Sequence, residues 1–149
     1  MNTKFIFCLI LIFSAQVVFA KENPEIIKIE EPETILFIGN SYLYYNDSLH
    51  NHFKRMVEEY RSDFDGGASV KSSTIGGSRL KHHDVERLIQ PKSISSIEKF
   101  ELVILQGGSS ETLNEVNRED FLYFAKKHID AIKMNGSEAA LYMTHAYIK

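Results

Sequence analysis

The sequence predicts an α/β fold in which helices cover a parallel β-sheet, and three observations indicate this fold class. Four short apolar runs have the length of strands, and segments with helical spacing separate them. Turns rich in small residues follow the first three runs. A chain that alternates strands and helices builds a parallel sheet with helices on its faces. The expected domain covers residues 34–149.

The four apolar runs give the predicted strands. They are Thr34–Ile38, Ala68–Thr74, Glu101–Gln106 and Ala139–Thr144. The second run alternates between apolar and polar residues, so we expect it to be half-buried or close to an edge.

Helical spacing predicts helices over residues 47–60, 83–90 and 117–136. Asp47 or Ser48 is a suitable N-cap for the first helix, and Gly136 closes the third. The apolar faces of the first and third helices comprise Leu49, Phe53, Met56, Val57 and Tyr60, and Phe121, Phe124, Ala125, Ile129 and Ile132.

Residues 1–20 have the features of a signal peptide, so the sequence predicts an exported protein. A positive start at Lys4 precedes a short apolar run, and the segment ends at the small residue Ala20. Residues 21–33 form a charged lead-in. The one cysteine, Cys8, lies in the leader, so the mature chain has no disulfides. We expect a bacterial periplasmic or secreted protein with no membrane span after cleavage.

Composition and motifs exclude several classes of partner. The formal net charge is −3 and no basic patch is present, which argues against nucleic-acid binding. Walker-type and Gly-x-Gly-x-x-Gly phosphate loops are absent, so no nucleotide cofactor is expected. The adjacent His82 and His83 point apart on a helix or a strand, so no metal site is expected either. A small-molecule or carbohydrate substrate remains.

Three predicted strands end in residues suited to acyl transfer. Gly39-Asn40-Ser41 follows the first strand, Gly76-Gly77 follows the second, and "QGGSS" begins at Gln106 and reaches Ser109 in its fourth position. Ligands bind at the carboxyl ends of parallel strands. A hydroxyl there supplies an attacking oxygen, and a bare glycine backbone brings N–H donors close to an oxyanion. Taken alone, each of these segments is typical of an ordinary turn between secondary-structure elements.

The sequence resembles the SGNH/GDSL hydrolases, a family of serine esterases on a flavodoxin-like three-layer α/β/α fold. "ILFIGNSYLYYND" resembles the first block of the family, which implies that Ser41 is the nucleophile. "STIGGSRLKHH" resembles the second block, whose glycine N–H binds the oxyanion and corresponds to Gly77. "ELVILQGGSSE" resembles a variant third block of carbohydrate acetylesterase-like branches, and "LYMTHAY" resembles their fourth strand. The implied substrate is an acetyl ester on a carbohydrate.

Two departures from the family pattern bear on activity. Ser109 stands where the third block usually has asparagine, so the third oxyanion donor is either Gln106 or Ser109. The Asp-x-x-His block that supplies the family's base does not follow the fourth predicted strand. We therefore expect a hydrolase domain truncated after that strand, with little or no esterase activity on its own.

Further residues are expected to line the substrate site. They are Asn40, Tyr42, Gly76, His83 and His145. His145 is expected to line the site rather than act as the base. Solvated positions are expected for His50 and His52, and a structural one for His128.

Tyrosines near the first strand end leave a second class of function open. Tyr42, Tyr44 and Tyr45 could stack on a sugar, or they could be ordinary half-buried packing residues. The alternative to an enzyme is thus a non-catalytic carbohydrate-binding domain. A flavodoxin-like nucleotide or flavin binder fits the strand order but lacks a phosphate loop.

Overall fold

The computed structural model describes residues 31–144 of the 149-residue chain. The predicted signal peptide, the lead-in up to residue 30 and His145 lie outside the described residues. Within the described range, no helix has both the length and the apolar character needed to cross a membrane.

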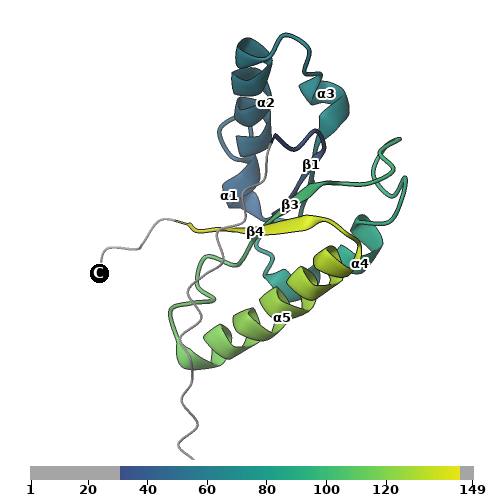
Figure 1. The fold of residues 1–149 in the computed structure, drawn as a ribbon. Helices are drawn as coiled ribbons and strands as arrows, with labels where there is room; N and C mark the ends of the chain where they lie inside the picture. The colour runs from purple at the N-terminus through teal and green to yellow at the C-terminus, as the bar shows by residue number, and fades with distance from the viewer. Residues whose placement is uncertain (1–30, 145–149) are drawn as a thin grey trace, which may run out of the picture.

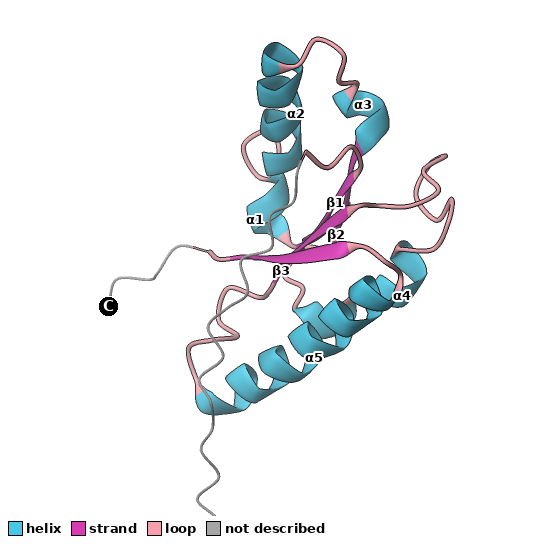
Figure 2. Ribbon diagram, viewed as in Figure 1, coloured by secondary structure: helices cyan, strands magenta, loops and turns pink. Residues whose placement is uncertain are grey.

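A parallel sheet forms the centre of the described structure (Figures 1 and 2). Its strands are β1 (Ile35–Gly39), β2 (Val70–Thr74), β3 (Leu102–Gln106) and β4 (Glu138–Tyr142). They lie in the order β2-β1-β3-β4, and every neighbouring pair is parallel. This confirms the predicted parallel α/β sheet. The order agrees with the first four positions of the doubly wound order 2-1-3-4-5.

Helices cover both faces of the sheet and give the described chain three layers (Figure 1). The helices are α1 (Ser41–Tyr44), α2 (Leu49–Tyr60), α3 (Gly66–Ser69), the 3-10 turn η1 (Leu80–His82), α4 (Val85–Leu88) and α5 (Glu115–Met134). Helices α1, α2 and α3 lie on one face, and α4 and α5 lie on the other. Strand β1 is therefore covered twice, and all five of its residues are buried.

Alternation along β1 divides the core into two clusters. Ile35 and Phe37 pack toward α2, where they meet Phe53. Leu36 and Ile38 belong to the cluster that packs against α5. Burying each such side chain contributes roughly 1.5–3 kcal/mol, so the two-sided burial of β1 anchors the sheet and fixes the place where β1 ends.

The predicted apolar face of α5 is confirmed, and that of α2 is confirmed only in part. All five predicted α5 positions belong to or pack against the core cluster. On α2, Met56 is 73% exposed and Tyr60 is 87% exposed, so their inclusion was wrong. Ser48 occupies the N-cap position of α2, as one of the two predicted alternatives, but its side chain makes no capping hydrogen bond, and Asp47 pairs with Arg55 at 2.7 Å. Helix α5 begins two residues earlier than predicted, since the Asn114 side chain caps it.

Two strand boundaries differ from the prediction by two residues, and the others agree with it to within one residue. Strand β2 begins at Val70 rather than Ala68, because the preceding residues form α3. The side chain of Asp65 caps that turn by accepting from the N–H of Ala68 at 2.9 Å. Strand β4 ends at Tyr142 rather than Thr144. A local cap therefore overrides the apolar pattern at the start of β2.

Strand β4 lies at the edge of the described sheet. Among the described residues it pairs only with β3, so its outer side carries unpaired backbone groups. Leu141 is 47% exposed and Met143 is 91% exposed at its carboxyl end.

Candidate functional site at the carboxyl edge of the sheet

The ends of β1, β2 and β3 lie side by side at the carboxyl edge of the sheet. Gly39 pairs in register with Thr74 of β2, and Ile38 pairs with Leu105 of β3. The chain leaves β1 toward the α1–α2 face, whereas it returns from β3 through α5 on the opposite face (Figure 1). Neighbouring strands whose connections diverge in this way form the switch point at which open α/β sheets bind ligands.

The side chain of Asn40 joins the three turns that follow these strands. Its Nδ2 donates to the carbonyl of Ser78 at 2.9 Å and to that of Gly107 at 3.2 Å. Its Oδ1 accepts from the N–H of Tyr42 at 3.1 Å and so caps α1. Asn40 is buried. The prediction that Asn40 contacts substrate is therefore corrected: its amide is committed to the protein.

Gln106 is equally committed to the protein. It is fully buried, and its Oε1 accepts from the backbone N–H of Asn40 at 2.8 Å. Its Nε2 donates to the carbonyl of Gly107. A Cβ on Gly39 would lie 2.6 Å from Gln106 Oε1, which explains why glycine ends β1. Of the two predicted candidates for the third oxyanion donor, Ser109 has the freer side chain.

Ser41 is the first residue of α1 and is partly exposed. Among the described residues, its hydroxyl has no hydrogen-bond partner, and its backbone N–H has no acceptor. Its neighbours on the chain, by contrast, are fixed by Asn40. Ser41 is thus an accessible hydroxyl on a constrained backbone at the end of the central strand.

Gly77 occupies the turn that follows β2. Its φ of +67° is a left-handed conformation that suits glycine, and nothing lies within 4 Å of the position of an added Cβ. The turn closes through a 3.1 Å bond from the N–H of Ser78 to the carbonyl of Ile75. The N–H of Gly77 has no acceptor among the described residues. It therefore remains available to a ligand.

Tyrosine side chains lie beside this turn. The hydroxyl of Tyr44 is 3.0 Å from the position of an added Cβ on Gly76. Tyr44 is 38% exposed, Tyr45 is 65% exposed, and their rings meet edge to face. Tyr42 is partly exposed at the start of α1. Two aromatic rings are thus presented to solvent close to the Gly76–Gly77 turn.

His83 lies behind the site and not in it. It is only 5% exposed, and its Nε2 lies 2.8 Å from Ser78 Oγ. Burial, together with the nearby His128 and His82, lowers the pKa of His83 to about 4, so the ring is neutral at pH 7. The prediction that His83 contacts substrate is therefore corrected.

The other described histidines also have partners away from Ser41. His50 Nε2 lies 3.4 Å from Ser72 Oγ, and His52 Nε2 lies 2.7 Å from the carbonyl of Asn46. His128 is buried, in agreement with its expected structural position, and its Nε2 lies 3.0 Å from the carbonyl of Leu80. No histidine in the described part of the chain bonds Ser41, and residues 31–144 contain no cluster of metal-ligating side chains.

The sequence analysis missed two polar residues at this edge. Glu111 is 1% exposed, and its carboxylate accepts from the N–H of Gly108. Ser78 is 2% exposed, and its hydroxyl donates to the carbonyl of Gly39 at 3.3 Å. Both brace the turns that hold the predicted donors. In the sequence, only its position after a run of small residues indicates that Glu111 could have a role at this edge. The sequence gives no indication that Ser78 would be buried beside His83.

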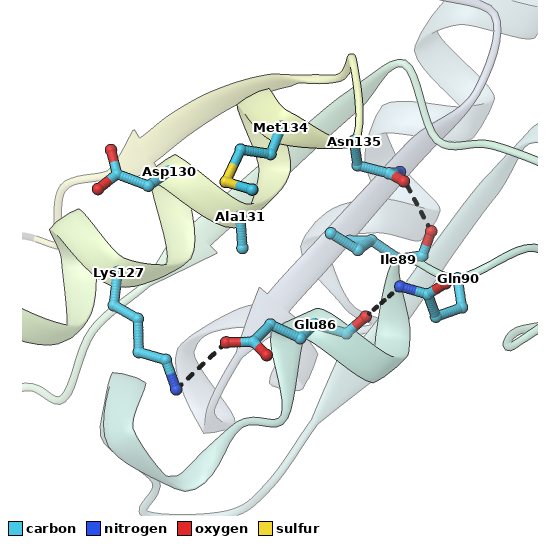
Figure 3. A pocket seen from close by; sticks show the side chains of 8 residues that line it. All are labelled: Glu86, Ile89, Gln90, Lys127, Asp130, Ala131, Met134 and Asn135. Carbon is cyan, nitrogen blue, oxygen red and sulfur yellow. Dashed lines mark hydrogen bonds and ion pairs between the residues drawn. The ribbon is translucent and has the colours of Figure 1, made fainter.

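A groove of about 580 Å³ adjoins Ser109 at the carboxyl ends of β3 and β4. Its wall includes the backbone of Gly107 and Gly108 and the side chains of Leu113 and Phe121. A second groove, of about 540 Å³, lies between α4 and α5 (Figure 3). It is lined by residues from the carboxyl-terminal half of α5, which leads into the start of β4. The second groove is therefore remote from the carboxyl edge and contains none of the predicted site residues.

Comparisons with known proteins leave the function to be inferred from this edge of the sheet. No protein-family model matches the chain, and no curated protein or solved structure matches it. The residues that an inference can use are Ser41, Gly77 and Ser109, which have accessible groups, and the buried polar residues that hold them.

Proposed function

We propose that the protein is a serine ester hydrolase of the SGNH/GDSL type with Ser41 as its nucleophile. The observation that carries the proposal is the contrast at the end of β1. The Asn40 side chain makes hydrogen bonds to two other turns and caps its own helix, whereas the adjacent Ser41 hydroxyl has no described partner. Buried amides that fix an unpartnered hydroxyl at a switch point are expected of a preorganised nucleophile.

The proposed reaction uses the free N–H groups at the same edge. Ser41 Oγ attacks the ester carbonyl and loses its proton, and the carbonyl oxygen becomes an oxyanion. The N–H groups of Ser41 and Gly77 donate to that oxyanion, with Ser109 as the third donor. The carbon–oxygen bond to the alcohol then breaks, the alcohol leaves with a proton, and water later releases the acid from Ser41.

Activation of Ser41 is the slow part of this mechanism. No imidazole in the described part of the chain bonds the Ser41 hydroxyl. With these residues alone, the hydroxyl proton therefore passes to water or buffer. Loss of a triad member typically leaves a rate only about 10³–10⁴ above the uncatalysed reaction. We therefore expect slow acylation of Ser41 that added imidazole accelerates, because a free base can take the proton that no described histidine accepts.

The proposed substrate is an acetyl ester on a carbohydrate. Tyr44 and Tyr45 support this choice, since both rings are exposed near the Gly76–Gly77 turn. Aromatic rings combine an apolar face with a polar hydroxyl, which suits the mixed surface of a sugar.

A serine-directed fluorophosphonate tests the proposal. The probe should modify the chain at Ser41, faster when imidazole is present, and S41A should remove that adduct. S110A is the matched control, because Ser110 is an exposed serine in the third turn and should be dispensable. An adduct that survives in S41A would contradict the proposal.

A non-catalytic carbohydrate-binding domain is the second candidate. The exposed rings of Tyr44 and Tyr45 favour it, since stacking on a sugar needs no nucleophile. Binding of an acetylated oligosaccharide that is lost in Y45A, with no adduct at Ser41 in the parent chain, would favour this function over the hydrolase.

A further inference from the structure

Two buried side chains join the turn after β2 to the end of β1. His83 Nε2 lies 2.8 Å from Ser78 Oγ, and Ser78 Oγ lies 3.3 Å from the carbonyl of Gly39. The carbonyl of Ser78 also accepts from Asn40 Nδ2 at 2.9 Å. Ser78 immediately follows Gly77, and Asn40 immediately precedes Ser41. Both proposed reaction groups are therefore one residue away from this set of bonds.

The direction of each hydrogen bond follows from what the groups can donate. A serine hydroxyl has one hydrogen, and the carbonyl of Gly39 can only accept, so that hydrogen goes to Gly39. The hydroxyl oxygen must then accept from His83, which places the ring hydrogen on Nε2. His83 Nδ1 is buried and has no partner among the described residues, as expected for a bare nitrogen lone pair.

We propose that His83 is a positioning residue that acts through Ser78. The Nε2–H of His83 orients the Ser78 hydroxyl toward Gly39 and thereby holds the Gly76–Gly77 turn against the end of β1. The inference rests on the proposed function, because the geometry that it maintains is that of Ser41 and the Gly77 N–H. In this tautomer the ring donates to serine and does not take its proton, so His83 is not a general base.

The neutral ring is suited to this task because of its surroundings. Burial disfavours a positive charge on His83 most strongly, and the second buried imidazole, His128, and the adjacent His82 disfavour it further. A charged His83 would also carry a buried Nδ1–H with no described acceptor. The hydrogen bond to Ser78 therefore persists across the neutral pH range.

The tautomer of His83 is the first test, and it does not depend on catalysis. In the full chain labelled with ¹⁵N-histidine, couplings from the ring nitrogens to the ring protons distinguish the Nε2–H form from the Nδ1–H form. The signals of His83 are assigned by their loss in H83Q. We expect the Nε2–H form at pH 7. An Nδ1–H form would overturn the inference, because Ser78 would then donate to the ring and release Gly39.

The rate of fluorophosphonate modification at Ser41 is the second test. H83L and S78A should each slow modification roughly 10- to 100-fold, the range expected when a donor shifts by about 1 Å. H83Q keeps an N–H donor and should retain most of the parent rate. H128Q is the matched control, because it removes the other buried imidazole without touching Ser78, and it should modify at the parent rate.

The outcomes separate this inference from the proposed function. A parent chain that modifies at Ser41 while S78A modifies equally fast would overturn the inference and leave the proposed function standing. Equal slowing in H83Q and H83L would also overturn it, since a donor would then make no difference. Should H83L fail to fold, S78A carries the comparison, because it removes the acceptor and leaves the imidazole in place.

Discussion

Polar side chains are buried at the carboxyl edge of the sheet, whereas they are exposed to solvent in the groove between α4 and α5. At the carboxyl edge, Asn40 and Gln106 are buried and hydrogen-bonded to backbone groups of other turns, and the buried Glu111 accepts from the N–H of Gly108 in its own turn. In the α4–α5 groove, Lys127 and Glu86 form a 3.2 Å ion pair while both side chains stay about half-exposed (Figure 3).

The difference indicates which part of the domain has its backbone fixed by buried hydrogen bonds. Burying a polar group costs free energy unless every hydrogen bond is replaced, whereas an exposed ion pair contributes about 0–1 kcal/mol. Polar groups buried together at one edge of a sheet therefore point to a site whose backbone must be held in place. The α4–α5 groove has the polarity of ordinary surface. Four predictions test this contrast.

Replacement of Asn40 should have the largest effect. N40A removes the side-chain bonds to Ser78, Gly107 and Tyr42 and leaves buried backbone groups unsatisfied. We expect the free energy of unfolding to fall by about 3 kcal/mol or more in urea denaturation. The matched control is N135A in the α4–α5 groove, where one 3.3 Å bond to Ile89 is lost and about 1 kcal/mol or less is expected. Equal losses in the two variants would contradict the contrast.

Acidification should destabilise the chain through His83. Its folded pKa of about 4 lies below the ordinary value of 6.5, so between these pH values the unfolded state binds more protons than the folded state. Stability therefore falls as the pH drops through this window and levels off below about pH 4. From pH 7 to pH 5 the expected loss from this group is about 2 kcal/mol.

Urea denaturation of the parent chain and H83Q at both pH values measures that contribution. Burial also lowers the pKa of His128, which adds a loss of the same sign that H83Q retains. The parent chain should therefore lose more stability on acidification than H83Q does. Parallel pH profiles for the two proteins would show that the His83 ring is not held neutral by its surroundings.

Replacement of Gly77 should have a moderate effect. Alanine at φ +67° costs about 1 kcal/mol of backbone strain, but its Cβ meets no neighbouring atom. We expect G77A to fold with that modest loss, as measured by thermal unfolding, and to modify more slowly at Ser41 if the Gly77 N–H shifts. A loss as large as that in N40A would mean that the turn is packed more tightly than the structure shows.

The ion pair in the α4–α5 groove should have the smallest effect. E86Q leaves Lys127 in water and is expected to change the free energy of unfolding by less than about 0.5 kcal/mol. Salt titration of the urea midpoint provides the check. A change in the free energy of unfolding above about 1 kcal/mol would contradict the contrast, because it would show that the α4–α5 groove contributes strongly to stability.

The sequence was informative where patterns are local or periodic. Apolar runs located all four strands, and the stripe from Phe121 to Ile132 identified the buried face of α5. Because the carboxyl ends of parallel strands share one edge of the sheet, the sequence also predicts that Ser41 and Gly77 lie at the same edge. The α3 turn was missed because the Asp65 cap competes locally with the strand pattern.

The buried polar bonds at the site were beyond sequence reasoning. The bond from the Asn40 N–H to Gln106 spans 66 residues of chain, and that from Asn40 to Ser78 spans 38. Such partners are set by strand order and register, which one sequence does not specify. For the same reason the sequence predicts substrate contacts for Asn40 and His83, whereas the side chains of both residues are buried against other protein groups.

Acyl transfer to Ser41 is the most direct test of the central claim. The chain is incubated with 4-nitrophenyl acetate, quenched with acid, digested and mapped by tandem mass spectrometry. Deacylation needs a base as much as acylation does, so an acetyl group should accumulate on Ser41 and be absent from that peptide in S41A. Acetylation confined to lysines, with Ser41 unmodified in the presence of imidazole, would contradict the account.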